Sequence, residues 1–178
     1  HGLRPKLHAD QLSDTGGARL AAEVGAASAD HLEHVSDEGI AALAEGGVVA
    51  VSLPLATLYL NQPPLPARRL IDAGVPVAVA TDFNPGSAPS YHLPFAMTLA
   101  CTTQRMTPAE VLKGATLYAA RAIGCDDRVG SLEPGKQADF VIVDAPSVNH
   151  WLYHLRANAA VATFICGEEV RGKREEPA

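Results

Sequence analysis

Residues 75–87, VPVAVATDFNPGS, join an apolar run to a loop rich in turn-forming residues, with Asp82 at the junction. The run mixes valine with alanine and carries no charge, which is typical of a strand buried on both faces of a parallel sheet. His8 and His31 occupy similar junctions in the segments PKLHADQ and ASADHLEH. Because catalytic groups of strand–helix barrels project from the C-terminal ends of the strands, these three residues are the first candidates for a functional site.

A unit of short strand, polar tip and amphipathic helix recurs through roughly the first hundred residues. The expected strands are residues 3–8, 28–31, 48–53 and 75–81, and the expected helices are residues 16–24, 36–45, 66–73 and 93–105. These successive strand–helix units predict an α/β fold with a parallel sheet covered by helices. They amount to half of an eight-stranded barrel, while an open, doubly wound sheet is an alternative with the same local pattern.

The clearest helix is expected at residues 107–123, where Thr107 is the N-cap and Glu110 completes a capping box. The pattern then turns to β structure. A Pro-Gly turn precedes an apolar strand at residues 138–143, and a hairpin is expected between residues 160 and 170.

This change of pattern divides the chain into three segments. Residues 1–124 are expected to form a partial barrel, and residues 125–172 a small β unit. The charged tail KREEPA, residues 173–178, is expected to be disordered.

The composition is that of an ordinary globular protein, with 47% hydrophobic and 19% charged residues among 178. The net charge of −6 gives no electrostatic case for nucleic acid, and no apolar stretch is long enough to cross a bilayer. The sequence has no glycine motif for phosphates and no CxxC pair, which argues against a nucleotide site and a thiolate zinc site. Because no signal peptide opens the chain, we expect a cytoplasmic protein.

His8 and Asp82 each have a chemical and a structural interpretation. The imidazole of His8 suits zinc or iron, and a strand end would hold it rigidly, but it could equally hydrogen-bond to a loop. The carboxylate of Asp82 could bind a metal ion or accept a proton from water, but it could also cap the turn before Asn-Pro-Gly. The residues alone leave both alternatives open.

Four motifs together resemble the imidazolonepropionases, a family within the metal-dependent amidohydrolase superfamily. They are HADQLS at residues 8–13, ADHLEH at 29–34, ATDFNPGS at 80–87 and SLEPGKQADFVI at 131–142. The resemblance extends from residue 1 to the region of Gly167, and the order and spacing of the motifs make it specific. It implies a (β/α)8 barrel with a β-sandwich built from both chain ends. This chain would supply barrel strands five to eight and the C-terminal share of the sandwich.

The resemblance also implies roles for individual residues. His8 and Asp82 would bind one metal ion, zinc or iron, and Asp82 would take part in proton transfer. His31 would orient or polarise the reacting group. The implied substrate contacts are Gln11, Asn84, Gly86 and Ser87. Without the resemblance, Gln11 is a solvated loop residue, and the other three serve turn chemistry and helix capping.

The implied reaction is the hydrolysis of the cyclic amide C–N bond of 4-imidazolone-5-propanoate, which gives N-formimidoyl-L-glutamate in histidine degradation. The family's first-strand His-x-His pair of metal ligands has no counterpart, because no HxH occurs in the sequence. The chain also opens without Met, directly before an expected strand. It therefore resembles the C-terminal half of the enzyme, and we expect the isolated chain to be inactive.

Two rival hypotheses remain. The first is another amidohydrolase, such as a nucleobase deaminase. Related deaminases keep a Glu three residues after the fifth-strand His as a proton shuttle, and Gln11 cannot shuttle protons at neutral pH. The second rival is a catalytically inactive half-barrel. Its only competence would be to associate with its missing half or with a second copy as a homodimer.

Overall fold

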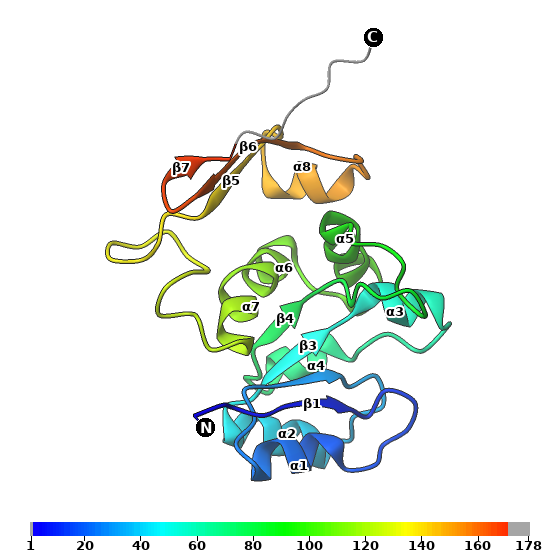
Figure 1. The fold of residues 1–178 in the computed structure, drawn as a ribbon. Helices are drawn as coiled ribbons and strands as arrows, with labels where there is room; N and C mark the ends of the chain where they lie inside the picture. The colour runs from blue at the N-terminus through cyan, green and yellow to red at the C-terminus, as the bar shows by residue number, and fades with distance from the viewer. Residues whose placement is uncertain (1, 171–178) are drawn as a thin grey trace.

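The computed structural model describes residues 2–170, so the tail expected at residues 173–178 lies outside the described residues. A four-stranded parallel sheet forms the centre of the first part of the chain (Figure 1). Its strands lie side by side in chain order: β1 (Lys6–Ala9), β2 (Ser28–His31), β3 (Val49–Ser52) and β4 (Val77–Val79). All four strands fall within the ranges expected from the sequence or within one residue of them.

The register of the sheet aligns the C-terminal ends of its strands. Ala9 at the end of β1 lies opposite His31 at the end of β2, and Ser52 at the end of β3 lies opposite Val79 of β4. All residues of β3 and β4 are buried, as expected for strands inside a parallel sheet. Consequently the loops that follow β1, β2 and β4 emerge at one edge.

Helices follow the strands as the sequence predicts. They are α1 (Gly17–Glu23), α2 (Asp37–Gly46), α4 (Ala67–Asp72) and α5 (Leu93–Gln104). Helices α1 and α2 pack against each other. The Ser36 hydroxyl caps α2 by accepting a hydrogen bond from the Gly39 amide. Gly47 ends α2 in the left-handed region, which glycine adopts without strain.

The prediction of a single helix at residues 107–123 is wrong, because the structure has two helices there. They are α6 (Pro108–Ala115) and α7 (Leu117–Ala122), and they are separated by Thr116 with φ −125° and ψ −88°. Helix α6 lies against β4, whereas α7 reaches across β3 and β4. The Thr116 hydroxyl also donates to the Leu112 carbonyl at 2.7 Å. Packing on the sheet therefore overrides the helix propensity of the segment.

Two short helices were not expected from the sequence. Helix α3 (Pro54–Tyr59) begins two residues after β3 with proline in its first turn. Helix α8 (Val148–Tyr153) begins at Ser147, whose hydroxyl accepts from the His150 amide. Each spans only six residues, which is too short to show a helical repeat of apolar residues.

The final part of the described chain forms a second, antiparallel sheet. Its strands are β5 (Phe140–Val143), β6 (Ala160–Ile165) and β7 (Glu168–Glu169), paired in that order. The predicted hairpin between residues 160 and 170 is thereby confirmed. Helix α8 packs against α5 and α6, and Figure 1 shows this sheet beyond those helices, apart from the parallel sheet.

A search of residues 2–170 for membrane-spanning segments finds no helix that combines the necessary length and apolar character.

Helix α6 approaches β4 most closely at Gly114. A Cβ at this position would lie 2.8 Å from the Val77 carbonyl oxygen and 3.1 Å from Val79 Cγ2. Alanine normally favours a helix over glycine by about 1 kcal/mol. We nevertheless expect Gly114→Ala to lower the free energy of unfolding by about 1–3 kcal/mol, because the backbone of β4 cannot yield. Urea denaturation measures this, with Lys113→Ala as the control, and unchanged stability would contradict the close approach.

An ion pair connects α4 to the N-terminus of α6. The Arg68 guanidinium donates to both carboxylate oxygens of Glu110, at 3.2 and 2.9 Å, and the Thr107 amide also donates to Glu110 at 2.8 Å. These bonds, chiefly those from Arg68, lower the pKa of Glu110 to about 2. The capping box predicted from Thr107 and Glu110 is present.

The pKa of Glu110 leads to a prediction about stability and pH. Because the folded-state pKa lies below the ordinary value of 4.5, the carboxylate stabilises the fold above pH 4.5. This contribution is lost as the pH falls toward 2. We expect Glu110→Gln to lower the free energy of unfolding by about 1 kcal/mol at pH 7 and by less at pH 3. Urea titrations at both values test this. The control is Glu38→Gln in the first turn of α2, and an equal deficit at both pH values would refute it.

Candidate functional site

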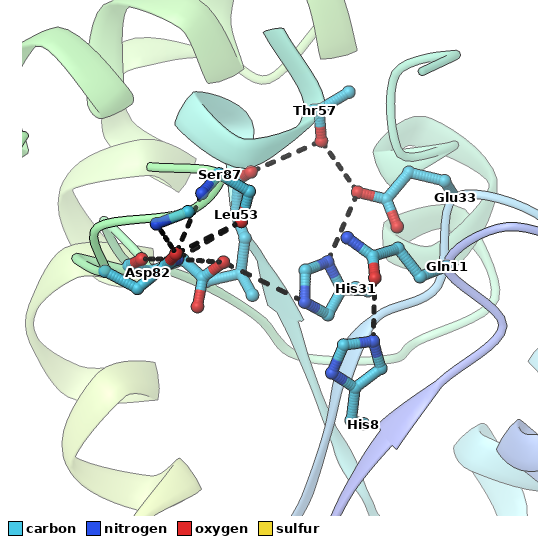
Figure 2. A network of polar contacts seen from close by, with 10 residues as sticks. His8, Gln11, His31, Glu33, Leu53, Thr57, Asp82 and Ser87 are labelled. Atoms are coloured by element: carbon cyan, nitrogen blue, oxygen red, sulfur yellow. Dashed lines mark hydrogen bonds and ion pairs between the residues drawn. The ribbon is translucent and has the colours of Figure 1, made fainter. Parts of the chain in front are cut away.

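Side chains from three strand ends converge at the C-terminal edge of the parallel sheet. The ring of His8 lies 4.2 Å, centroid to centroid, from the ring of His31. Nε2 of His31 lies 4.0 Å from Oδ2 of Asp82 (Figure 2). The structure thus brings together the three residues that the sequence selected by their positions after apolar runs.

The backbone at these strand ends is unusual. His31, Leu32 and Asp82 have positive φ angles of 79°, 69° and 53°, in the left-handed region. For residues other than glycine this costs on the order of 1 kcal/mol each, and such strain concentrates at functional sites. Side chains alternate between the two faces of a strand, so a regular β2 would point His31 to the same face as Ala29, which is fully buried. The left-handed turn ends that alternation, and the ring lies against His8 instead.

The loop after β1 is held by Asp10, which sequence reasoning missed. Its buried carboxylate accepts hydrogen bonds from the backbone amides of Thr15, Gly17 and Ala18 at 2.9–3.0 Å. The backbone carbonyl of Asp10 accepts a hydrogen bond from the His34 amide at 2.9 Å, which connects this loop to the loop after β2. Asp10 caps α1 from seven residues away, beyond the spacing of the local capping motifs, so the sequence offered no signal.

Gln11 lies at the start of this loop, next to the exposed His8. Its Oε1 atom is 2.8 Å from Nε2 of His8. The family resemblance implies that Gln11 contacts the substrate, and this role stays a prediction. In the structure, the amide helps to orient the imidazole that is the candidate metal ligand.

The loop after β4 is organised by Asn84. Its Oδ1 accepts from the amides of Gly86 and Ser87 at 2.9 and 2.8 Å, and its Nδ2 donates to the Asp82 carbonyl at 2.7 Å. The turn chemistry weighed in the sequence analysis is therefore present and holds Asp82 in place. Substrate contacts from these three loop residues stay a prediction.

A buried carboxylate that was not selected from the sequence lies behind His31. Oε1 of Glu33 is 3.7 Å from Nδ1 of His31 and accepts a hydrogen bond of 2.7 Å from the Thr57 hydroxyl (Figure 2). Glu33 stands among polar residues in ADHLEH, where an acid resembles an ordinary loop residue. Its partner Thr57 lies in α3, a helix that was not expected from the sequence.

The candidate metal ligands do not form a complete metal site by themselves. Among residues 2–170, no group of three or more His, Cys, Asp or Glu side chains is placed to hold a metal ion. Catalytic zinc sites normally use three protein ligands. The imidazole of His8 and the carboxylate of Asp82 suit zinc or iron chemically, but they fall short of that number.

A cavity of about 480 Å³ adjoins Asp82. It lies between the sheet and α7, with an apolar lining that includes Val51, Ala78 and Ala120. Lys6 and Asp30 also line it. A predominantly apolar cavity with a few charged groups is the usual form of a small-molecule site.

Comparison with known sequences identifies close relatives of this chain. A model of the amidohydrolase family matches residues 7–171. The chain is 55% identical over 169 residues to an imidazolonepropionase of Geobacillus kaustophilus (strain HTA426) and 44% identical over 169 residues to one of Fusobacterium nucleatum subsp. nucleatum. Each alignment covers 95% of this chain, but only 40% and 41% of the relatives. The chain thus spans about two fifths of the length of these relatives.

Solved structures share the same fold. A zinc-bound adenosine deaminase from Xanthomonas campestris aligns with a TM-score of 0.81 at 26% identity, over 94% of this chain and 45% of that one. A mutant atrazine chlorohydrolase from Arthrobacter aurescens TC1, complexed with zinc and atraton, gives 0.80 at 22% identity, over 95% of this chain and 44% of that one. With a family match over most of its length, a parallel sheet and polar side chains gathered at its C-terminal edge, the chain belongs to the amidohydrolase family.

Proposed function

We propose that this chain is the C-terminal part of an imidazolonepropionase. The protein would hydrolyse 4-imidazolone-5-propanoate to N-formimidoyl-L-glutamate in histidine degradation. The observation that carries the proposal is the convergence of His8, His31 and Asp82 in a chain 55% identical to such an enzyme. Residues 1–124 would supply barrel strands five to eight, and residues 125–172 the C-terminal share of a β-sandwich.

The residues of the site have distinct roles in this proposal. Water adds to the ring carbonyl carbon, and Asp82 accepts a proton from that water. The ring C–N bond then breaks, and the proton passes to the departing nitrogen. His31 stabilises the charge that develops on the carbonyl oxygen. Gln11, Asn84, Gly86 and Ser87 contact the substrate.

His8 and Asp82 would hold one zinc or iron ion together with ligands from the rest of a longer protein. Such an ion supplies Lewis-acid chemistry, because it lowers the pKa of water and polarises a carbonyl oxygen. The protein would then bind a small-molecule substrate. A cytoplasmic location is consistent with a metabolic reaction of this kind.

A deaminase is the enzymatic alternative, since an adenosine deaminase is among the structural neighbours. Gln11 counts against it, because an amide can donate and accept hydrogen bonds but cannot shuttle a proton. An inactive half-barrel that associates with its missing half or with itself is the alternative for the isolated chain. The β1 and β4 strands lie at the two edges of the sheet and would be available for such pairing.

We expect the isolated 178-residue chain to show little or no hydrolysis of 4-imidazolone-5-propanoate, whereas the full natural protein that contains it is active. One imidazole and one carboxylate do not complete a catalytic metal site. The measurements are product formation with added zinc or iron, and oligomeric state by sedimentation. Efficient, metal-dependent turnover by a monomeric 178-residue chain would overturn this.

In the full protein, we expect Asp82→Asn to lower kcat by about 10²–10⁴-fold, the usual cost of losing a general base. Asparagine tolerates the left-handed backbone that Asp82 adopts, so the change removes the charge and basicity rather than the turn. Gln11→Ala is the comparison. Hydrogen bonds worth about 1 kcal/mol each should be lost, which raises KM or lowers kcat/KM modestly.

Steady-state kinetics, with the metal content of each variant measured, separates the two effects. If Asp82→Asn kept a near-normal kcat with full metal content, Asp82 would be a turn-capping residue and the mechanism would be wrong. If Gln11→Ala were as damaging as Asp82→Asn, the role of Gln11 would be more than a substrate contact.

A further inference from the structure

Glu33 has no role in the proposed hydrolysis, yet it forms a buried pair with His31. The side chain of Glu33 is 1% exposed and that of His31 is 3% exposed. A carboxylate withdrawn from water is costly unless other groups compensate for the lost solvation. Two buried atoms in this pair, Nδ1 of His31 and Oε2 of Glu33, have no hydrogen-bond partner among the described residues. Nδ1 of His31 can donate a hydrogen bond when it carries a proton, and Oε2 of the adjoining Glu33 can accept one.

Rigid structure holds the carboxylate behind the imidazole. Oγ1 of Thr57 lies 2.7 Å from Oε1 of Glu33 and 3.2 Å from the Leu53 carbonyl oxygen. Thr57 is buried in α3, which starts within two residues of the end of β3. Figure 2 shows a row of contacts that leads from Thr57 through Glu33 and His31 to Asp82, with the imidazole between the two carboxylates.

The two ring nitrogens of His31 therefore face different groups. Nδ1 faces Oε1 of Glu33 at 3.7 Å, and Nε2 faces Oδ2 of Asp82 at 4.0 Å. The hydrogen bond made by one nitrogen of a histidine determines which nitrogen carries the proton and what the other can do. A small rotation of either side chain would bring Nδ1 and the Glu33 carboxylate into hydrogen-bond distance.

We propose that Glu33 is a positioning residue, held by Thr57, that keeps a proton on Nδ1 of His31. Nε2, which faces Asp82, is then free to accept the proton that Asp82 takes from water, and once protonated it donates to the developing charge on the carbonyl oxygen of the substrate. The effect of Glu33 on rate rests on the proposed hydrolysis, but the tautomer of His31 is a property of the chain itself. The same logic applies to buried carboxylates behind histidines in other active sites, where they fix the ring orientation and the tautomer.

Two measurements on the full natural protein test the proposal. The first is ¹⁵N NMR of ring-labelled histidine, with the His31 signals assigned by comparison with His31→Asn. In the wild type we expect the Nδ1–H form of neutral His31. Glu33→Gln keeps the shape but replaces one oxygen with a donor, so we expect the Nε2–H form to grow. The second measurement is steady-state kinetics. We expect kcat to fall about 10–100-fold with KM within about threefold.

Substitutions at Thr57 provide a second route that does not alter the carboxylate. Thr57→Val removes the hydroxyl and should shift the tautomer and kcat in the same direction as Glu33→Gln, but less. Thr57→Ser retains the hydroxyl, so its His31 tautomer and its kcat should match those of the wild type. The matched control is Ser52→Ala, which removes a buried hydroxyl that donates at 2.7 Å to Gln104 of α5 rather than to Glu33 or His31. It should lose stability without changing the tautomer.

The outcomes are distinguishable. If Glu33→Gln leaves the His31 tautomer unchanged, the positioning role is refuted. It is also refuted if the kcat of Glu33→Gln falls no more than the kcat of Ser52→Ala, because the loss would then follow from lower stability alone. If wild-type His31 carries its proton on Nε2, it is refuted as well. If the wild type does not hydrolyse 4-imidazolone-5-propanoate, the proposed function is wrong, and the NMR comparison still decides the role of Glu33.

Discussion

The parallel register of the first sheet is the constraint on which the site depends. Because β1 to β4 pair in chain order with their ends aligned, the residues that follow them emerge at one edge. Side chains alternate along a strand, so a slip of one residue would turn His8 to the face now occupied by Ala9. Burial of Ala9, at 2% exposure, opposes that slip and so keeps His8 on the side of His31. The core thereby determines the geometry of the polar site.

Hydrogen bonds made by residues of these turns offset the strain at the strand ends. His31 and Asp82 leave their strands through left-handed backbone, which costs free energy. The Leu32 amide donates to the Ala9 carbonyl and the Asn84 side chain donates to the Asp82 carbonyl. These bonds keep each turn in its strained form and so hold the two side chains in their orientations. This is preorganisation at the level of the backbone.

The sequence predicted those features that depend on neighbouring residues in the chain. The apolar runs marked the four parallel strands, Ser36 and the Thr107 capping box marked helix starts, and strand ends marked His8, His31 and Asp82. The break at Thr116, the capping by Asp10 and the burial of Glu33 could not be predicted, because each depends on packing between segments. Glu33 and Thr57 are 24 residues apart, and no local pattern connects them.

The groups that orient the chemistry and the groups that would bind a metal ion are organised differently. Glu33, which accepts a hydrogen bond from Thr57, faces His31 within the described chain, and Asn84 donates to the Asp82 carbonyl there too. The metal ligands, in contrast, are too few among the described residues. The orientation of His31 therefore comes from burial and from the side chains that face it, whereas the candidate metal ligands among the described residues do not complete a site.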